Sequence, residues 1–157
     1  MSTATQRERR FVSPDPAATT ALGAALGAVA CPADIVCLWG DLGAGKTHLA
    51  KAFGAALEVR ETITSPSFIL MAEYRGRMPL FHIDLYRLVD ATDALAGGLI
   101  DDRQVEGVTL VEWPERLGSA LPAARLDVII DGSGDDPRTL TLRSIGEGAL
   151  RYLKVVP

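Results

Sequence analysis

Residues 40–47 read Gly40-Asp41-Leu42-Gly43-Ala44-Gly45-Lys46-Thr47, which fits the phosphate-binding loop motif of two glycines, a lysine and a hydroxyl at fixed spacing. The apolar run Ile35–Trp39 before it predicts a buried strand. Behind it, apolar residues recur at helical spacing as far as residue 57 and predict a helix. Strand, glycine loop and helix form the local arrangement in which such a motif works.

The residue types of this loop suit phosphate chemistry. Glycines let backbone N–H groups approach phosphate oxygens without a Cβ in the way. The start of the following helix adds unpaired donors and the positive end of the helix dipole. Lys46 can place its ammonium on the β- and γ-phosphates, and Thr47 can place its hydroxyl on Mg²⁺. The alternative is a glycine turn without a ligand.

The composition predicts one globular domain spanning residues 1–157. A net charge of −4 argues against a protein that binds nucleic acid by itself, because such proteins usually carry a strongly basic face. The two cysteines are too few for a disulfide framework and fit a reduced, cytoplasmic setting. No apolar run is long enough to span a membrane, and the N-terminus lacks the apolar core of a signal peptide.

The N-terminal region divides into a polar and a helical part. Residues 1–10, which end in Arg7-Glu8-Arg9-Arg10, are expected to be a flexible tail, with RNA contact by the arginines as the minority alternative. Residues 17–30 place apolar side chains on one helical face, and Ser13 or Asp15 is expected to cap that helix. Gly23 and Gly27 either weaken the helix or allow another element to pack closely.

A hydroxyl-rich segment follows the loop helix: Thr62-Ile63-Thr64-Ser65-Pro66-Ser67 has four hydroxyls within six residues. In many nucleotide-hydrolysing proteins a segment at this place senses the γ-phosphate. The alternative is an ordinary turn that leads into a strand.

The next two segments predict a hairpin, with strands at Ser67–Tyr74 and Pro79–Arg87. Alternation in the second strand places His82, Asp84 and Tyr86 on one face. An acid within such an apolar strand is either satisfied by neighbours as a structural residue or faces the nucleotide. With a phosphate loop in the chain we favour the second role for Asp84, and we treat His82 as structural.

A second apolar strand, residues 108–113, ends in Glu112. Open α/β sheets place their chemistry at the carboxyl ends of such strands. Glu112 can hold Mg²⁺ directly or through water, or orient the attacking water. Trp113 is compatible with a core position.

The remaining segments complete the predicted fold. Residues 90–107 are expected to form a short helix at 91–95 and a polar loop, and 126–131 and 138–143 an antiparallel hairpin at a sheet edge. Residues 146–156 are a candidate closing helix. The sequence thus predicts a three-layer α/β domain of the P-loop NTPase class with a mixed parallel and antiparallel sheet.

Four stretches together resemble one family, in order and spacing. They are GDLGAGKT at 40–47, TSPSF at 64–68, HIDLYRL at 82–88 and LVEWPE at 110–115. The chain is similar over residues 13–145 to the TsaE (YjeE) family, the small ATPases of bacterial tRNA threonylcarbamoyladenosine synthesis. The loop alone would indicate only a superfamily, whereas DLYRL and VEWPE make the resemblance specific.

The resemblance implies the site and its cofactors. ATP and Mg²⁺ would bind, and the ATP would be hydrolysed. Catalytic residues would be Lys46, Asp84 and Glu112, and the metal would be held by Thr47 and Glu112 with Asp84 close by. The nucleotide-binding residues would be Leu42, Gly43, Ala44, Gly45, Lys46, Thr47 and His48.

The resemblance also implies partners. The TsaD and TsaB proteins of the family's complex carry out carbamoyl transfer to adenosine 37 of tRNA, so this chain would meet tRNA only through them. Its ATPase step would support turnover of the complex. Residues 64–67 would act as the nucleotide-sensing switch, and residues 13–19 are a candidate wall for the adenine.

Three departures from the family pattern stand out. His48 follows Thr47 where a second threonine is usual, so its ring either crowds the phosphates or is harmless. Ser67 replaces a threonine but keeps the hydroxyl. Residues 93–102 lack the usual glutamate-rich stretch, which puts partner contacts through them in doubt.

Three functions therefore compete. The leading hypothesis is an ATPase, slow in isolation because no arginine is plainly placed as a finger. The others are a small-molecule kinase, which needs an acceptor pocket and usually an arginine-bearing lid, and a non-catalytic module whose assembly is gated by nucleotide.

Overall fold

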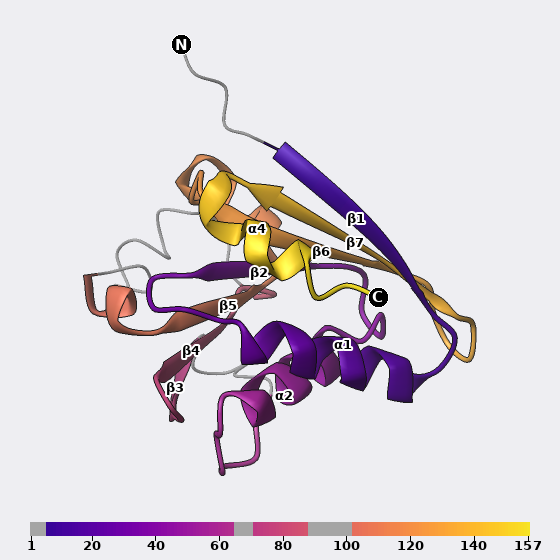
Figure 1. The fold of residues 1–157 in the computed structure, drawn as a ribbon, viewed down its shortest axis with the longest axis horizontal. Coiled ribbons are helices and arrows are strands. Elements are labelled where there is room, and N and C mark those ends of the chain that lie inside the picture. The colour runs from indigo at the N-terminus through magenta and orange to yellow at the C-terminus, as the bar shows by residue number, and fades with distance from the viewer. Residues whose placement is uncertain (1–5, 65–70, 88–101) are drawn as a thin grey trace.

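A mixed β-sheet forms the middle of the molecule. The computed structural model describes residues 6–64, 71–87 and 102–157. Within these ranges seven strands lie in the order β1-β7-β6-β2-β5-β4-β3, and Figure 1 shows them with β1 and β3 at the two edges. Their bounds are Gln6–Ser13 (β1), Ile35–Trp39 (β2), Met71–Arg75 (β3), Pro79–Asp84 (β4), Val108–Glu112 (β5), Arg125–Asp131 (β6) and Arg138–Ile145 (β7).

The centre of the sheet is parallel and its flanks are antiparallel. β2 pairs in parallel with β5 and with β6, and β4 pairs in parallel with β5. The hairpins β3–β4 and β6–β7 and the pair β1–β7 are antiparallel. The predicted mixed α/β sheet is therefore confirmed. Parallel strands direct their carboxyl ends to one edge, so the ends of β2, β4 and β5 meet there.

Two expectations about the sheet edge were wrong. Residues 6–10 belong to β1, paired along its length with β7, rather than to a flexible tail; residues 1–5 lie outside the described part. Arg9 of β1 donates to the carbonyls of Leu153 and Val156 at 3.4 and 3.3 Å. These bonds join β1 to the C-terminal segment of the chain. Because β1 pairs with the outer edge of β7, and β6 pairs with β2, the β6–β7 hairpin lies inside the sheet and not at its edge.

Two long helices cover one face of the sheet, side by side (Figure 1). α1 spans Pro16–Ala28 and α2 spans Lys46–Ala56. Asp15 caps α1, since its Oδ1 accepts from the N–H of Ala18 at 2.9 Å, as one of the two predicted caps. A Cβ at Gly27 would lie 2.3 Å from the carbonyl oxygen of Phe53, so this glycine permits close helix packing.

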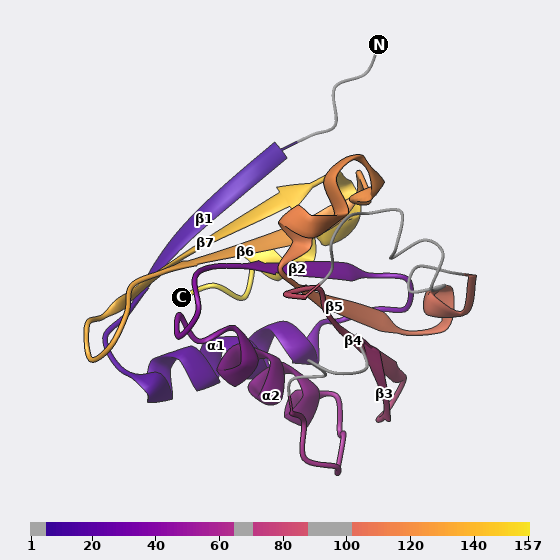
Figure 2. The ribbon, with the colours of Figure 1, turned by 180° about the vertical axis from the view of Figure 1, so that it is seen from behind.

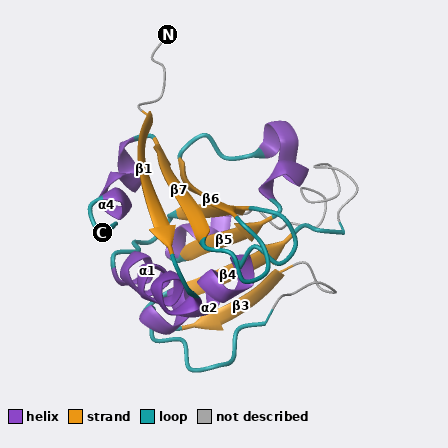
Figure 3. Ribbon diagram, turned by 90° about the vertical axis from the view of Figure 1, so that its right-hand side faces the viewer, coloured by secondary structure: helices purple, strands orange, loops and turns teal. Residues whose placement is uncertain are grey.

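Shorter helices complete the layers. They are the 3₁₀ helices η1 (Asp102–Glu106), η2 (Pro114–Ala120) and η3 (Glu147–Ala149) and the α-helix α4 (Leu150–Leu153). The predicted closing helix is thus two short pieces, η3 and α4. The orange segment after β5 in Figure 2, which is η2, lies across the sheet from α1 and α2. Figure 3 shows the strands between these helical layers.

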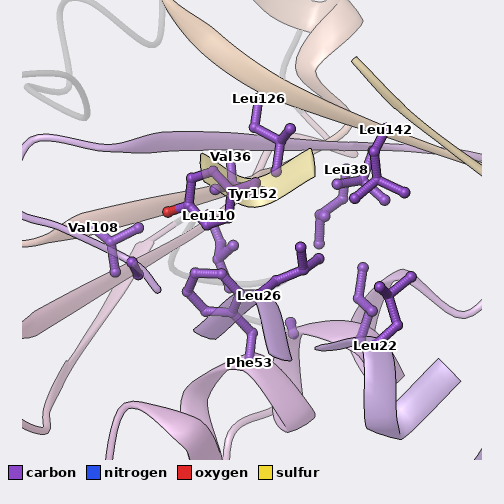
Figure 4. Packing of buried hydrophobic residues seen from close by; sticks show 14 of the residues in the cluster. Leu22, Leu26, Val36, Leu38, Phe53, Val108, Leu110, Leu126, Leu142 and Tyr152 are labelled. Carbon is purple, nitrogen blue, oxygen red and sulfur yellow. The ribbon is translucent and has the colours of Figure 1, made fainter. Parts of the chain in front are cut away.

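Two apolar clusters hold the layers together. The larger one lies between the sheet and α1, α2 and α4, and Figure 4 shows Leu22, Phe53 and Tyr152 pointing into it. The smaller one joins Leu117 of η2 to Cys37 and Val111 on the other face. Each fully buried large apolar side chain stabilises the fold by about 1.5–3 kcal/mol. This packing fixes the start of α2 beside the carboxyl ends of β4 and β5.

Among the helices in the three described ranges, none is both long enough and apolar enough to cross a membrane.

Candidate functional site

The glycine loop connects β2 to α2 with the backbone geometry that the sequence indicates. Gly43 and Gly45 have φ angles of 79° and 110°, the left-handed region in which an L side chain is strained. Gly45 is the N-cap of α2, and its carbonyl accepts from the N–H of Leu49 at 2.9 Å. A Cβ at either glycine would meet no atom within 4 Å, so strain and not crowding selects glycine here.

The side chain of Lys46 is held against the loop. It is only 6% exposed, and its Nζ donates to the carbonyl of Asp41 at 3.0 Å and to that of Gly40. The ammonium also lies 4.0 Å from the centre of the Trp113 ring. Burial lowers the pKa of Lys46. The nearby carboxylates partly offset that effect, and Glu112 contributes most to the offset. These contacts hold the Lys46 ammonium at the mouth of the loop.

Thr47 and Glu112 meet from two different elements. The Thr47 hydroxyl, on the first turn of α2, donates to the two carboxylate oxygens of Glu112 at 3.2 and 3.4 Å. Glu112 ends β5 and is 3% exposed, and Asp84 stands opposite it in the β4–β5 register. The Oδ1 of Asp84 accepts from the N–H of Tyr86 at 3.0 Å. The predicted residues Thr47, Asp84 and Glu112 thus come together at one edge of the sheet.

His82 belongs to this site, which the sequence reasoning missed. Its Nε2 lies 2.6 Å from Oε2 of Glu112, and the His82 side chain is fully buried. An ionised carboxylate only accepts, so Nε2 carries the proton that the bond needs. The Nδ1 atom of His82 is buried with no hydrogen-bond partner among the described residues. Alternation had placed His82 on the face of Asp84, but only the pairing of β4 with β5 directs it to Glu112.

A test of this buried pair is the substitution His82→Leu, which keeps the volume and removes the donor. We expect the free energy of unfolding to fall by about 1.5–3 kcal/mol, the usual value of a hydrogen bond to a charged group. Urea unfolding with an unchanged slope would measure it. The control is His48→Leu, at an exposed histidine, with an expected change below about 1 kcal/mol. Equal losses in the two variants would contradict a special role for His82.

The cavity at the loop has a volume of about 480 Å³. Its lining contains every predicted site residue except Ala44: Leu42, Gly43, Gly45, Lys46, Thr47, His48, Asp84 and Glu112. Tyr86, Arg87 and Trp113 line it as well, and the rings of Tyr86 and Trp113 lie 4.9 Å apart. Trp113 has a left-handed backbone, with φ of 60°, and its half-buried ring lines the cavity while it packs against the smaller apolar cluster.

A second cavity, of about 350 Å³, lies between the start of α1 and the loop. It shares Gly45 and His48 with the first cavity, so the two adjoin. The remaining lining is Ser13, Pro14, Asp15, Pro16, Thr19, Ala44, Gly134, Asp135, Asp136 and Arg138. The expected wall at residues 13–19 therefore borders a real cavity. Its other wall, the turn 134–136 with Arg138, had no signal in the sequence.

His48 is directed toward α1. Its Nε2 lies 2.7 Å from the Thr20 hydroxyl oxygen and 3.2 Å from the carbonyl oxygen of Pro16. The ring therefore ties the first turn of α2 to the first turn of α1. These contacts hold the ring on the side of α1 while His48 also lines the loop cavity, so its effect on the phosphates stays a prediction.

The hydroxyl-rich segment is described only in part. Thr64 donates its N–H to the hydroxyl of Tyr74 at 3.5 Å. Residues 65–67 lie outside the described residues, so the switch stays a prediction. The same holds for the helix expected at 91–95 and for the departures at 93–101.

Comparison with known proteins identifies the family. The family profile described as "Threonylcarbamoyl adenosine biosynthesis protein TsaE" matches residues 13–140. The chain belongs to the TsaE family. A TsaE relative from Bacillus subtilis (strain 168), named tRNA threonylcarbamoyladenosine biosynthesis protein, is 37% identical over 89% of this chain and 88% of its own length. One from Treponema pallidum (strain Nichols) is 35% identical over 85% and 98%.

A solved TsaE-like structure supports the fold as well. The crystal structure of Bacillus subtilis YdiB matches with a TM-score of 0.69 and 35% sequence identity, covering 99% of this chain and 94% of that one. The resemblance that the four motifs indicated is therefore confirmed as family membership, and the α/β fold of the TsaE chain is confirmed with it.

Proposed function

We propose that this chain binds Mg–ATP and hydrolyses it as the ATPase subunit of tRNA threonylcarbamoyladenosine biosynthesis. The observation that carries the proposal is the meeting of the Thr47 hydroxyl with the Glu112 carboxylate, 3.2 Å apart, beside the buried Lys46. Hydroxyl, carboxylate and lysine are the groups that bind metal and phosphate in phosphate-loop enzymes. The names of the TsaE relatives supply the pathway.

The loop fits a triphosphate. Its left-handed glycines leave the backbone open to a ligand, and α2 begins at Lys46, where unpaired N–H groups favour an anion. The Lys46 side chain lines the same cavity and brings its own ammonium charge to it. On binding, this ammonium would leave the carbonyls of Gly40 and Asp41 for the phosphate oxygens.

The oxygen donors fit Mg²⁺. Magnesium is bound by one or two protein oxygens together with phosphate and water, and rarely by a dedicated protein cage. Thr47 and Glu112 would provide those oxygens, with Asp84 opposite Glu112 in the register. Within the described ranges, no group of three or more His, Cys, Asp or Glu residues could hold a metal alone. The bound ion would neutralise charge that develops on the phosphate oxygens.

Each residue then has a role in hydrolysis. Lys46 and the loop amides would stabilise the charge that develops as water attacks the γ-phosphate in line. Asp84 would orient the attacking water or the metal's water shell. His82, bonded to Glu112, would keep that carboxylate directed at Thr47. The second cavity, between residues 13–19 and Arg138, would hold the adenine and ribose.

Partners complete the proposal. The TsaD and TsaB proteins would bind this chain in the cytoplasm and bring it to tRNA. A net charge of −4 fits such indirect contact, because proteins that bind nucleic acid by themselves usually carry a strongly basic face. Arg87 is exposed at the cavity rim, and Arg138 donates to loop carbonyls. Because the sequence places no arginine plainly as a finger on the γ-phosphate, we expect slow hydrolysis by the isolated chain and acceleration when partners bind.

The decisive experiment is reconstitution with TsaB and TsaD proteins, reading released phosphate and modified tRNA together. We expect both products only when this chain, ATP and Mg²⁺ are all present. Modified tRNA formed at the full rate without this chain would overturn the proposal. A screen of small-molecule acceptors that yields one phosphorylated product per ATP would instead establish a kinase.

Tryptophan emission offers a direct binding test, because the Lys46 ammonium lies against the Trp113 ring. In a Trp39→Phe background, which leaves Trp113 as the sole tryptophan, Mg–ATP should change the emission. The change should saturate at the concentration that calorimetry gives for binding. The variant Trp113→Phe, which retains Trp39, is the control and should show no change. An unaltered Trp113 signal at saturating ATP would contradict the proposed placement.

A further inference from the structure

Arg138, the first residue of β7, connects the β6–β7 turn to the glycine loop. Its Nε donates to the carbonyl of Ala44 at 3.0 Å, and one Nη2–H to that of Gly43 at 3.3 Å. On the turn side Nη2 donates to Gly134 at 3.0 Å and Nη1 to Asp136 at 2.5 Å. Four of the five guanidinium N–H groups are therefore directed at carbonyl oxygens.

These contacts set the orientation of two peptide planes in the loop. In a trans peptide the C=O and the following N–H point in opposite directions. The Gly43–Ala44 plane is also fixed at its other end, where the N–H of Ala44 donates to Asp41 at 3.1 Å. For the Ala44–Gly45 plane, the bond from Arg138 to Ala44 directs the N–H of Gly45 away from the guanidinium. Gly45 lies between the two cavities, so its N–H is a candidate phosphate donor.

The surroundings of Arg138 leave it little room to move. A Cβ at Gly132, in the turn, would lie 2.9 Å from the Cδ of Arg138. A Cβ at Gly40, where β2 enters the loop, would lie 2.8 Å from the carbonyl oxygen of Ile130 on β6. The first approach packs the turn against Arg138 within the hairpin, and the second brings β6 close to the start of the glycine loop. With its Cδ packed against the turn, the guanidinium is held beside the loop.

We propose that Arg138 is a positioning residue, which aligns the glycine-loop amides for the β-phosphate without binding the nucleotide base. The inference rests on the proposed function, because it needs a nucleotide in the loop. A lysine cannot replace this arginine, since one ammonium cannot reach the carbonyls of Gly43, Ala44 and the turn in a fixed fork. The orientation of the loop would accordingly depend on a residue outside the loop motif.

The test compares ADP with AMP, which lacks the β-phosphate. For Arg138→Ala and Arg138→Lys we expect ADP affinity, measured by calorimetry with Mg²⁺, to fall by about 10- to 100-fold. AMP affinity, measured by competition, should change less than about twofold, since the loop amides would contact only the β-phosphate. The matched control is Arg143→Ala on the same strand, which removes an exposed ion pair to Glu8 and should leave both affinities unchanged.

Several results would overturn the inference. Equal losses for ADP and AMP would mean that Arg138 contacts the base or ribose itself. Wild-type ADP affinity in Arg138→Lys would mean that charge alone matters. Urea midpoints of the variants show whether they fold, and Arg138→Lys serves if Arg138→Ala does not. A wild-type chain that binds neither ADP nor ATP would refute the proposed function and this inference with it, whereas the first two results refute the inference alone.

Discussion

Replacing Lys46 by methionine is expected to lower the rate of ATP hydrolysis by about 100- to 1,000-fold, or about 2.7–4 kcal/mol of transition-state stabilisation. The reason is that Lys46 places its ammonium in the loop cavity, close to both the loop carbonyls and Glu112. Methionine keeps the apolar length of the stem. Phosphate release in the reconstituted complex, with saturating ATP, would measure the loss.

The same substitution separates function from stability. Burial lowers the pKa of Lys46, so in the folded state the charged form is less favourable than in the unfolded chain. Neutral pH lies below the pKa of Lys46 in the unfolded chain, so burial of the charged ammonium there costs folding free energy, and Lys46→Met removes this cost. The substitution also removes the donor to the carbonyls of Gly40 and Asp41, which acts in the opposite direction. We therefore expect the free energy of unfolding to change by less than about 1 kcal/mol.

The control for Lys46 is Lys51→Met on the exposed side of the same helix, and it should leave the rate unchanged. If Lys46→Met hydrolyses ATP at more than about a tenth of the wild-type rate, the proposed role in charge stabilisation is wrong. A large loss of folding stability in Lys46→Met would mean instead that the lysine acts as a structural link between loop and strand.

Replacing Glu112 by glutamine is expected to reduce Mg²⁺-dependent hydrolysis by about 100-fold or more, while ATP binding without metal is kept. Glutamine has nearly the shape of glutamate, and its carbonyl oxygen can still accept from His82 or Thr47. What it lacks is the charge that would hold the metal. The expected signature is a higher Mg²⁺ requirement, measured by titration of phosphate release after removal of metal with a chelator.

The matched control is Glu106→Gln, which is exposed and lies just before the other end of β5. It should behave as wild type in both assays. The decisive reading for Glu112→Gln is tRNA modification with the partner proteins. If the variant binds ATP and supports modification at the wild-type rate, hydrolysis is not the function, and a nucleotide-gated assembly module becomes the better explanation.

The local parts of this protein can be inferred from the order of its amino acids. The strand–loop–helix at 35–57, a helix cap at Ser13 or Asp15 and the β3–β4 hairpin follow from patterns that span a few residues. The position of Glu112 at the end of an apolar strand follows from such a pattern too. Period 2, period 3.6 and glycine conformations are short-range properties, and a motif carries them intact.

Which of these parts meet became visible only in the folded chain. His82 reaches Glu112 across 30 residues, and Arg138 reaches Ala44 across 94. Residues 6–10, expected to be part of a tail, belong to an edge strand, because all of β1 pairs in antiparallel register with β7. Such contacts depend on the order of strands in the sheet, which is set by packing of the whole chain and not by periodicity. The chemical groups of the site were therefore predictable, whereas the residues that hold them in place were not.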